Sequence, residues 1–159
     1  MRALFFSTVL LALVTAGCGP TVDLKQGLQA TDVSTGWFDS GMVSGQNKLV
    51  PSVTFKFKNV SAETLSTLQA NVLFRRVGED AEWGSGYVKV TGSDGLPPGQ
   101  SSSTQTVNSQ LGYTGSEPRQ EMLANAQFVD ARVLIYAKYA ATQWQLIGEY
   151  PIERRLIAK

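Results

Sequence analysis

Short segments in which apolar and polar residues alternate are the feature that most constrains the fold of this chain. The clearest run is Val53-Thr54-Phe55-Lys56-Phe57-Lys58, and the pattern recurs in residues 65–76 and 129–139. Period-two alternation is typical of a strand with one dry and one wet face. The residues expected to face the core are Val53, Phe55, Phe57, Leu68, Ala70, Val72, Phe74, Val129, Ala131, Val133, Ile135 and Ala137.

Further strands are expected over residues 28–38, 83–90, 101–107 and 143–155, with turn signals rich in Gly and Pro between them. Residues 116–124 are expected to form a short helix capped by Ser116, with Pro118 in its first turn. About seven short strands at this spacing predict an all-β, immunoglobulin-like β-sandwich with one inserted helix near 117–124. An eight-stranded barrel is the alternative architecture. In the last of these strands, one face is expected to carry Trp144, Leu146, Tyr150 and Ile152.

The beginning of the chain has the parts of a secretory signal. Arg2 supplies a positive charge, residues 3–14 are mostly apolar, and small residues follow. The apolar stretch is shorter than the roughly 20 residues of a spanning helix. The run Thr15-Ala16-Gly17-Cys18 resembles the lipobox of bacterial lipoproteins, with Thr15 where that motif usually has Leu. The alternative is an ordinary signal peptide with a chance cysteine.

The lipobox resemblance implies cleavage after Gly17 and attachment of lipid to the sulfur of Cys18. It divides the chain into a signal peptide at 1–17, a lipidated tether at 18–27 and a folded domain at 28–159. Two or more acyl chains make such anchoring to a membrane stable. Gly19 follows the cysteine, and the lipoprotein sorting rule then implies an outer-membrane anchor with the domain facing the periplasm. In an organism with one membrane, the domain would lie on its outer face.

The composition argues against several classes of function. The chain has no histidine, and Cys18 is its only cysteine. The most common general base and both Ser-His-Asp and Cys-His chemistry are therefore missing. Loss of Arg2 with the leader leaves equal numbers of basic and acidic side chains, which does not favour a nucleic-acid interface. We expect no catalytic, cofactor-binding or metal-binding set and no enzymatic activity.

Aromatic residues supply the candidate ligand surface. Trp83 and Tyr87 are four residues apart in an expected strand, so they are predicted to point the same way. Tyr113 lies in the Gly-bracketed loop at 111–115. Residues 108–127 interrupt the strand pattern, and this loop and helix are the expected specialised surface. The alternative role for such aromatics is packing in the core.

Clustered charged residues are further candidates. The cluster Glu79, Asp80 and Glu82 offers oxygen ligands for Ca²⁺, but a solvated hairpin tip is the simpler interpretation. The pairs Arg75-Arg76 and Arg154-Arg155 are neighbours on strands, so each pair is expected to face opposite sides and to form no anion clamp. Glu117 and Glu121 are expected to share a solvated helix face.

A second resemblance covers residues 55–100. The run Phe55-Lys56-Phe57-Lys58-Asn59, the apolar residues 65–74 and the turn Leu96-Pro97-Pro98-Gly99-Gln100 resemble FxLYD-type domains of bacterial envelope lipoproteins. The chain has Val72-Leu73-Phe74-Arg75 where that family has Leu-Tyr-Asp. The resemblance implies an immunoglobulin-like module outside the cytoplasm.

Both resemblances together predict a lipoprotein anchored in the cell envelope. Its expected role is non-enzymatic, as a protein-binding or accessory module with an envelope protein as partner. The alternative is a module that binds a glycan or a lipid through exposed aromatic side chains.

Overall fold

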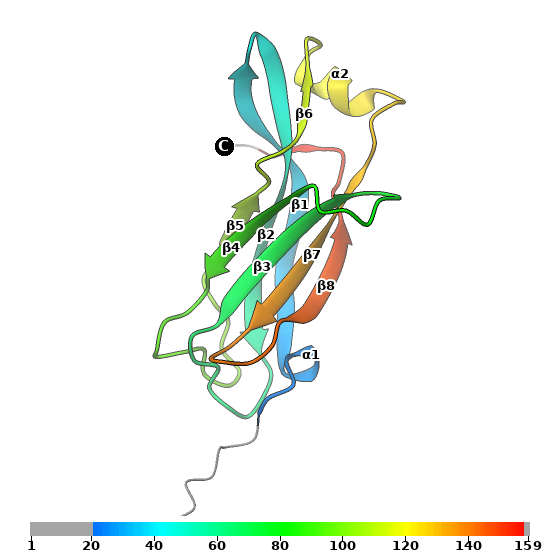
Figure 1. Cartoon of the computed structure of the whole chain (residues 1–159). Helices are drawn as coiled ribbons and strands as arrows, with labels where there is room; N and C mark the ends of the chain where they lie inside the picture. Colours follow the sequence, from blue (N-terminus) through cyan, green and yellow to red (C-terminus); the bar gives the residue numbers. More distant parts are fainter. Residues whose placement is uncertain (1–20, 158–159) are drawn as a thin grey trace, which may run out of the picture.

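The computed structural model describes residues 21–157, so the expected leader, Cys18 and Gly19 lie outside the described residues. Within residues 21–157, nine strands form two sheets that pack face to face (Figure 1). One sheet has the strand order β5-β2-β1-β9, with β6 also paired to β2, and the other has the order β4-β3-β7-β8. The predicted all-β sandwich is confirmed, and the two separate sheets exclude the barrel.

The described elements differ from the expected ones mainly in length. The prediction missed the short strands β6 and β9 and the helical turn α1, and it made the first strands too short. In chain order the elements are α1 (Leu24–Gly27), β1 (Leu28–Val43), β2 (Gln46–Asn59), β3 (Gln69–Arg76), β4 (Gly84–Lys89), β5 (Gln105–Asn108), β6 (Tyr113–Gly115), α2 (Arg119–Ala124), β7 (Ala131–Lys138), β8 (Gln145–Pro151) and β9 (Leu156–Ile157).

The core lies between the two sheets, as the alternation predicts. In β2, the side chains of Val53, Phe55 and Phe57 are fully buried. The inward-facing residues of β3 and β7 are buried in the same way, because each contributes every second side chain to the inner face. Val129 is an exception: it precedes β7 and is 40% exposed, so its predicted core position was wrong.

The hairpin of β1 and β2 is the longest feature of the fold. Its antiparallel pairing runs from Leu28 opposite Asn59 to Val43 opposite Gln46. Pro51 lies within β2 opposite Trp37, although the sequence pattern placed it at the start of the strand. Because the hairpin is longer than the strands of the second sheet, its far half projects past that sheet (Figure 1).

The packed part of the chain begins earlier than Leu28. Leu24 is fully buried in the core, and the Val22 backbone N–H donates a 2.6 Å hydrogen bond to the Tyr139 hydroxyl. Asp23 caps α1 by accepting a hydrogen bond from the Lys25 N–H at 3.0 Å. The segment expected to be a tether thus contributes a helical turn to the domain. A single leucine in a polar run gives no pattern from which this turn could be predicted.

A β-bulge in β8 reverses part of the face predicted for the last strand. Ile135 pairs with Gly148, but the next residue, Tyr136, pairs with Leu146, so Ile147 is the extra residue. Ile147 packs against the core, whereas Leu146 is 37% exposed. Trp144 and Leu146 are therefore outside the sandwich, while Tyr150 and Ile152 pack into it. The predicted single face was wrong because one inserted residue changes the side.

Asn59, at the end of β2 nearest α1, is a fully buried polar residue. Its Nδ2 donates 2.7 Å hydrogen bonds to the carbonyls of Glu63 and Leu96. Its Oδ1 accepts hydrogen bonds from the backbone N–H of Ser61 at 2.9 Å and from the Ser61 hydroxyl at 2.7 Å. One side chain therefore fastens two loops that follow β2 and β4.

Candidate functional site

The end of the sandwich opposite α1 carries the elements that interrupt the regular fold. We call it the distal end; it comprises the β1–β2 turn, β6 and α2 (Figure 1). β6 pairs with residues 47–49 of β2. The Asn47 carboxamide donates a 2.9 Å hydrogen bond to the Glu117 carbonyl, and Arg119 pairs with Asp39 at 2.6 Å. These contacts fix the segment at 113–119 against the hairpin.

α2 begins later than the sequence predicted. Its N-cap position is Pro118, without a side-chain hydrogen bond, so the expected cap at Ser116 was wrong. Glu117 consequently lies before the helix and does not share a helix face with Glu121. Buried Met122 and Leu123 hold this short helix against the domain.

Four aromatic rings pack together beneath the distal end. Trp37, fully buried, lies with its ring centroid 4.7 Å from that of Phe128 and 5.6 Å from that of Tyr113. The rings of Trp83 and Tyr113 are 5.0 Å apart. The structure therefore brings together two of the predicted ligand residues, Trp83 and Tyr113, but both pack against the core.

Tyr87 lies elsewhere, so the predicted patch of Trp83 and Tyr87 was wrong. Trp83 precedes β4, and its backbone N–H donates to the Phe74 carbonyl at 2.8 Å. Because it is not part of the regular strand, strand alternation does not fix its side. Tyr87 is in the strand, faces outward and is 60% exposed.

Tyr113 connects the aromatic cluster to the surface. Its hydroxyl donates a 3.0 Å hydrogen bond to the Val129 carbonyl, which fixes the ring between β6 and the segment before β7. Burial raises the pKa of the Tyr113 hydroxyl above its usual value, and the nearby Arg76 guanidinium opposes that shift in pKa. Tyr113 is therefore a neutral donor at physiological pH.

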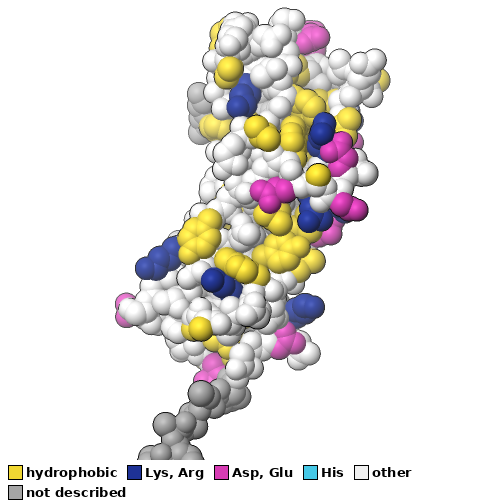
Figure 2. All heavy atoms as spheres, in the orientation of Figure 1, with side chains coloured by type: hydrophobic (Ala, Val, Ile, Leu, Met, Phe, Trp, Pro, Cys, Tyr) yellow, Lys and Arg dark blue, Asp and Glu magenta, His cyan; other side chains and the backbone are white. Residues whose placement is uncertain are grey.

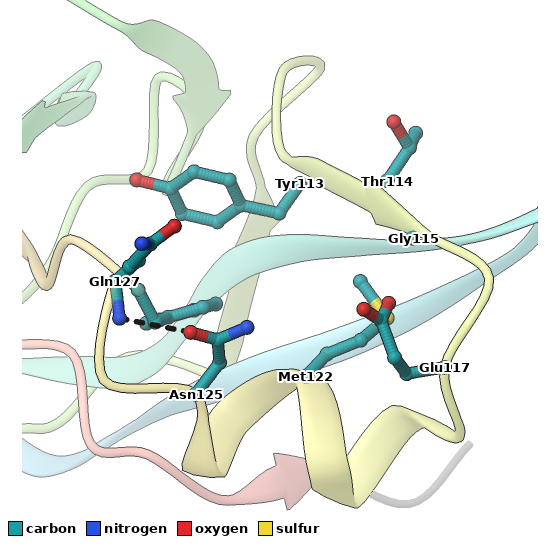
Figure 3. A pocket seen from close by; sticks show the side chains of 8 residues that line it. Tyr113, Thr114, Gly115, Glu117, Met122, Asn125 and Gln127 are labelled. Carbon is teal, nitrogen blue, oxygen red and sulfur yellow. Dashed lines mark hydrogen bonds between the residues drawn. The ribbon is translucent and has the colours of Figure 1, made fainter.

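A pocket of about 190 Å³ lies between β6 and α2, beside this cluster. Figure 3 shows the Tyr113 ring on one side of it and the Glu117 carboxylate next to Met122 on the other. Asn125 lies between them, and its Oδ1 accepts a 2.8 Å hydrogen bond from the Gln127 N–H. The lining residues are Tyr113, Thr114, Gly115, Glu117, Met122, Asn125, Gln127 and Phe128. Most of this site falls in the predicted surface at 108–127.

The outer face of the β4-β3-β7-β8 sheet carries a second surface. The rings of Tyr87 and Trp144 meet at 6.4 Å in a T-shaped arrangement, and the Lys138 ammonium lies 4.9 Å from the Trp144 ring centroid. Trp144 is 37% exposed. Figure 2 shows hydrophobic and basic side chains side by side on this face. The bulge at Ile147 explains why the sequence pattern did not place Trp144 here.

The charged candidates mainly fasten the fold. Glu79 pairs with Arg76 at 3.0 Å, and Asp80 lies 3.5 Å from Arg132. Arg154 pairs with Asp130 at 2.6 Å and also donates to the backbone carbonyls of Leu123, in α2, and Phe128, in the segment after it. Within residues 21–157, no group of three or more acidic or metal-ligating side chains is placed to hold a metal ion.

Trp37, Met122, Asn125 and Phe128 are the site residues that sequence reasoning missed. Trp37 and Phe128 meet across about ninety positions of the chain, and Met122 and Asn125 lie in the expected 108–127 surface without a pattern that marks them individually. The interruption of the strand pattern at 108–127 was the one signal that pointed to this end of the fold.

Comparisons with known proteins add one structural similarity. No protein-family model matches the chain, and no curated protein matches it. The fold is similar to the X-ray structure of the Northeast Structural Genomics Consortium target SoR45, with a TM-score of 0.47 and 14% sequence identity. The alignment covers 82% of this chain and 89% of that one. Among the described helices, none has the length and apolar character needed to cross a membrane.

Proposed function

We propose that this chain is a lipoprotein of the cell envelope that acts as a non-enzymatic protein-binding or accessory module. Anchoring through Cys18 is supported by the lipobox-like run Thr15-Ala16-Gly17-Cys18 after an apolar leader. Gly19 supports outer-membrane sorting with the domain in the periplasm. The partner would be another protein of the envelope.

The anchor would set the orientation of the domain. Val22, which is hydrogen-bonded to Tyr139, is four residues after Cys18. Four extended residues reach at most about 14 Å. The α1 end would therefore lie close to the bilayer, and the distal end would point away from it.

The location of the pocket carries this proposal. It lies at the distal end, between β6 and α2, where an anchored domain would meet a partner protein. Two neighbouring apolar side chains are exposed at the same end: at the β1–β2 turn, Met42 is 67% and Val43 46% exposed. A partner that covered these side chains would remove apolar surface from water, which favours association.

Site-specific photocrosslinking in intact cells tests the proposal. A photoreactive amino acid at position 42 is expected to capture an envelope protein reproducibly. The matched control carries the same group at exposed Asp94, in the turn preceding Leu96, which bonds to Asn59 at the α1 end. Capture at both positions alike, or at neither, would contradict a specific distal surface.

Replacing the lipidated residue tests the anchor itself. We expect Cys18→Ser to leave the leader uncleaved or to release the protein from membranes, because the serine hydroxyl cannot receive the thioether-linked lipid. Mass spectrometry of the N-terminus and membrane fractionation measure the two outcomes. Unchanged processing and unchanged fractionation would rule out lipidation at this cysteine.

Binding of a glycan or lipid on the outer sheet face is the second candidate function. The observation that favours it is the exposed pair Tyr87 and Trp144 beside Lys138. We expect iodide to quench Trp144 more than partly buried Trp83 and fully buried Trp37, so that Trp144→Phe lowers the quenchable fraction of the emission while Trp37→Phe does not. Protection from iodide by soluble cell-wall glycans or phospholipid vesicles would support this function, and a lack of protection by both would exclude it.

A further inference from the structure

We infer that the distal pocket binds an ammonium or guanidinium group on an aliphatic stem, as found in a lysine or arginine side chain of the partner protein. This inference rests on the proposed function and names the chemical group that the site recognises. It follows from the charge, the walls and the size of the pocket.

The charge of the pocket is that of one carboxylate. Glu117 is the charged residue among those that line it. In the described part of the chain, no lysine or arginine forms an ion pair with Glu117. The neighbouring cations are already paired, Arg119 with Asp39 at 2.6 Å and Arg154 with Asp130 at 2.6 Å. A ligand cation would therefore meet an uncompensated negative charge.

The walls suit a cation with an apolar stem. The rings of Tyr113 and Phe128 lie 4.6 Å apart, and the Met122 side chain faces the pocket from α2 (Figure 3). Methylene groups would pack on these surfaces, while the cation would be attracted by the ring faces and by Glu117. The Arg154 guanidinium, 5.1 Å from the Phe128 ring centroid, already makes such a contact within the protein.

The carboxamides of Asn125 and Gln127 complete the polar part of the lining. A carboxamide oxygen accepts hydrogen bonds, and both ammonium and guanidinium groups only donate them. The volume of about 190 Å³ is below the roughly 300–1,000 Å³ of sites for drug-sized ligands. One side chain, rather than a larger molecule, fits this space.

Gly115 keeps the pocket open. A Cβ atom at this position would lie 2.7 Å from the Glu117 Oε2 and 3.3 Å from the Met122 Cε. Both atoms are the far ends of flexible side chains, so a larger residue would fill the pocket without displacing backbone. Gly115→Val is therefore a variant that blocks the site and keeps the fold.

Titration of the full-length protein in detergent, followed by NMR of the Gly115 and Asn125 amides, tests the chemistry. We expect saturable shifts with N-acetyl-lysine amide and N-acetyl-arginine amide, and binding of the uncharged N-acetyl-norleucine amide roughly tenfold weaker. Gly115→Val is expected to abolish the shifts. Glu117→Gln is expected to weaken binding roughly fivefold, while Glu121→Gln, on a carboxylate outside the lining, leaves it unchanged.

Each outcome decides a separate point. Equal binding of norleucine amide, or no effect of Glu117→Gln, would overturn the preference for a cation.

Crosslinking from position 42 distinguishes the source of the cation: loss of the captured partner in Gly115→Val supports a side chain of that partner. An unchanged capture in Gly115→Val, with n-butylammonium binding as tightly as lysine amide, would indicate a free amine and overturn the partner assignment. Failure to capture any protein with the unaltered pocket would contradict the proposed function instead.

Discussion

Phe57→Ala is expected to lower the free energy of unfolding by about 3–5 kcal/mol. Phe57 is fully buried between the two sheets, and the centroids of its ring and that of Phe55 are 5.0 Å apart with an interplanar angle of 61°. Truncation removes apolar surface from the core and leaves a cavity that the two sheets cannot fill by moving together. Urea denaturation, monitored by the emission of the tryptophans, measures the loss.

Lys58→Ala is the matched control, because Lys58 is the next residue of β2 and its side chain is exposed. Its change in unfolding free energy is expected to stay within about 0.5 kcal/mol. A loss below about 1 kcal/mol for Phe57→Ala, or equal losses for both variants, would contradict the facing of β2.

Asn59→Asp is expected to lower the free energy of unfolding by roughly 3 kcal/mol, although the two side chains have nearly the same shape. The change replaces the Nδ2 donor with an oxygen, which would then face the carbonyls of Glu63 and Leu96, both 2.7 Å from the present Nδ2. A buried charge without donors on that side adds to the loss. Thermal unfolding followed by circular dichroism measures the effect.

Ser61→Ala is the comparison variant, because it removes only one of the hydrogen bonds made by the Asn59 side chain. It removes the hydroxyl that donates to Asn59 Oδ1 at 2.7 Å, and we expect a loss of about 1 kcal/mol. If Asn59→Asp were no more destabilising than Ser61→Ala, the two carbonyl contacts would not hold the loops as described.

The sandwich could be predicted because facing in a regular strand is a local property. In β2, β3 and β7, each side chain is set by the strand period alone, so residues such as Phe55, Val72 and Ile135 were placed correctly in the core. Burial on one face and solvent on the other leaves a pattern that needs no knowledge of the partner strand.

The failures of prediction occurred where the strand period stops. A single extra residue, Ile147, moved Leu146 and Trp144 to the outside, and Trp83 left the strand pattern by preceding β4. Leu24 was assigned to a tether because one apolar residue among polar neighbours carries no period. A bulge or a chain end is decided by contacts with other elements, and a single sequence does not contain them in readable form.

The pocket was predictable as a region but not as a constellation. The interrupted pattern at 108–127 located it, yet its shape depends on β6 pairing with β2 and on Phe128 packing against Trp37. These contacts join residues up to about ninety positions apart. Such long-range packing is the part of the site that only three-dimensional structure reveals.

The short parallel strand β9 determines when the distal end can be completed. Trp37, near the beginning of the domain, donates its backbone N–H to the carbonyl of Arg155 at 2.8 Å, and it is opposite Leu156 in β9. Because synthesis begins at the N-terminus, the pairing of Trp37 can form only after residues 155–157 have been made. Proteolytic removal of residues 155–157 would loosen the end that carries the pocket while leaving the opposite end of the sandwich closed.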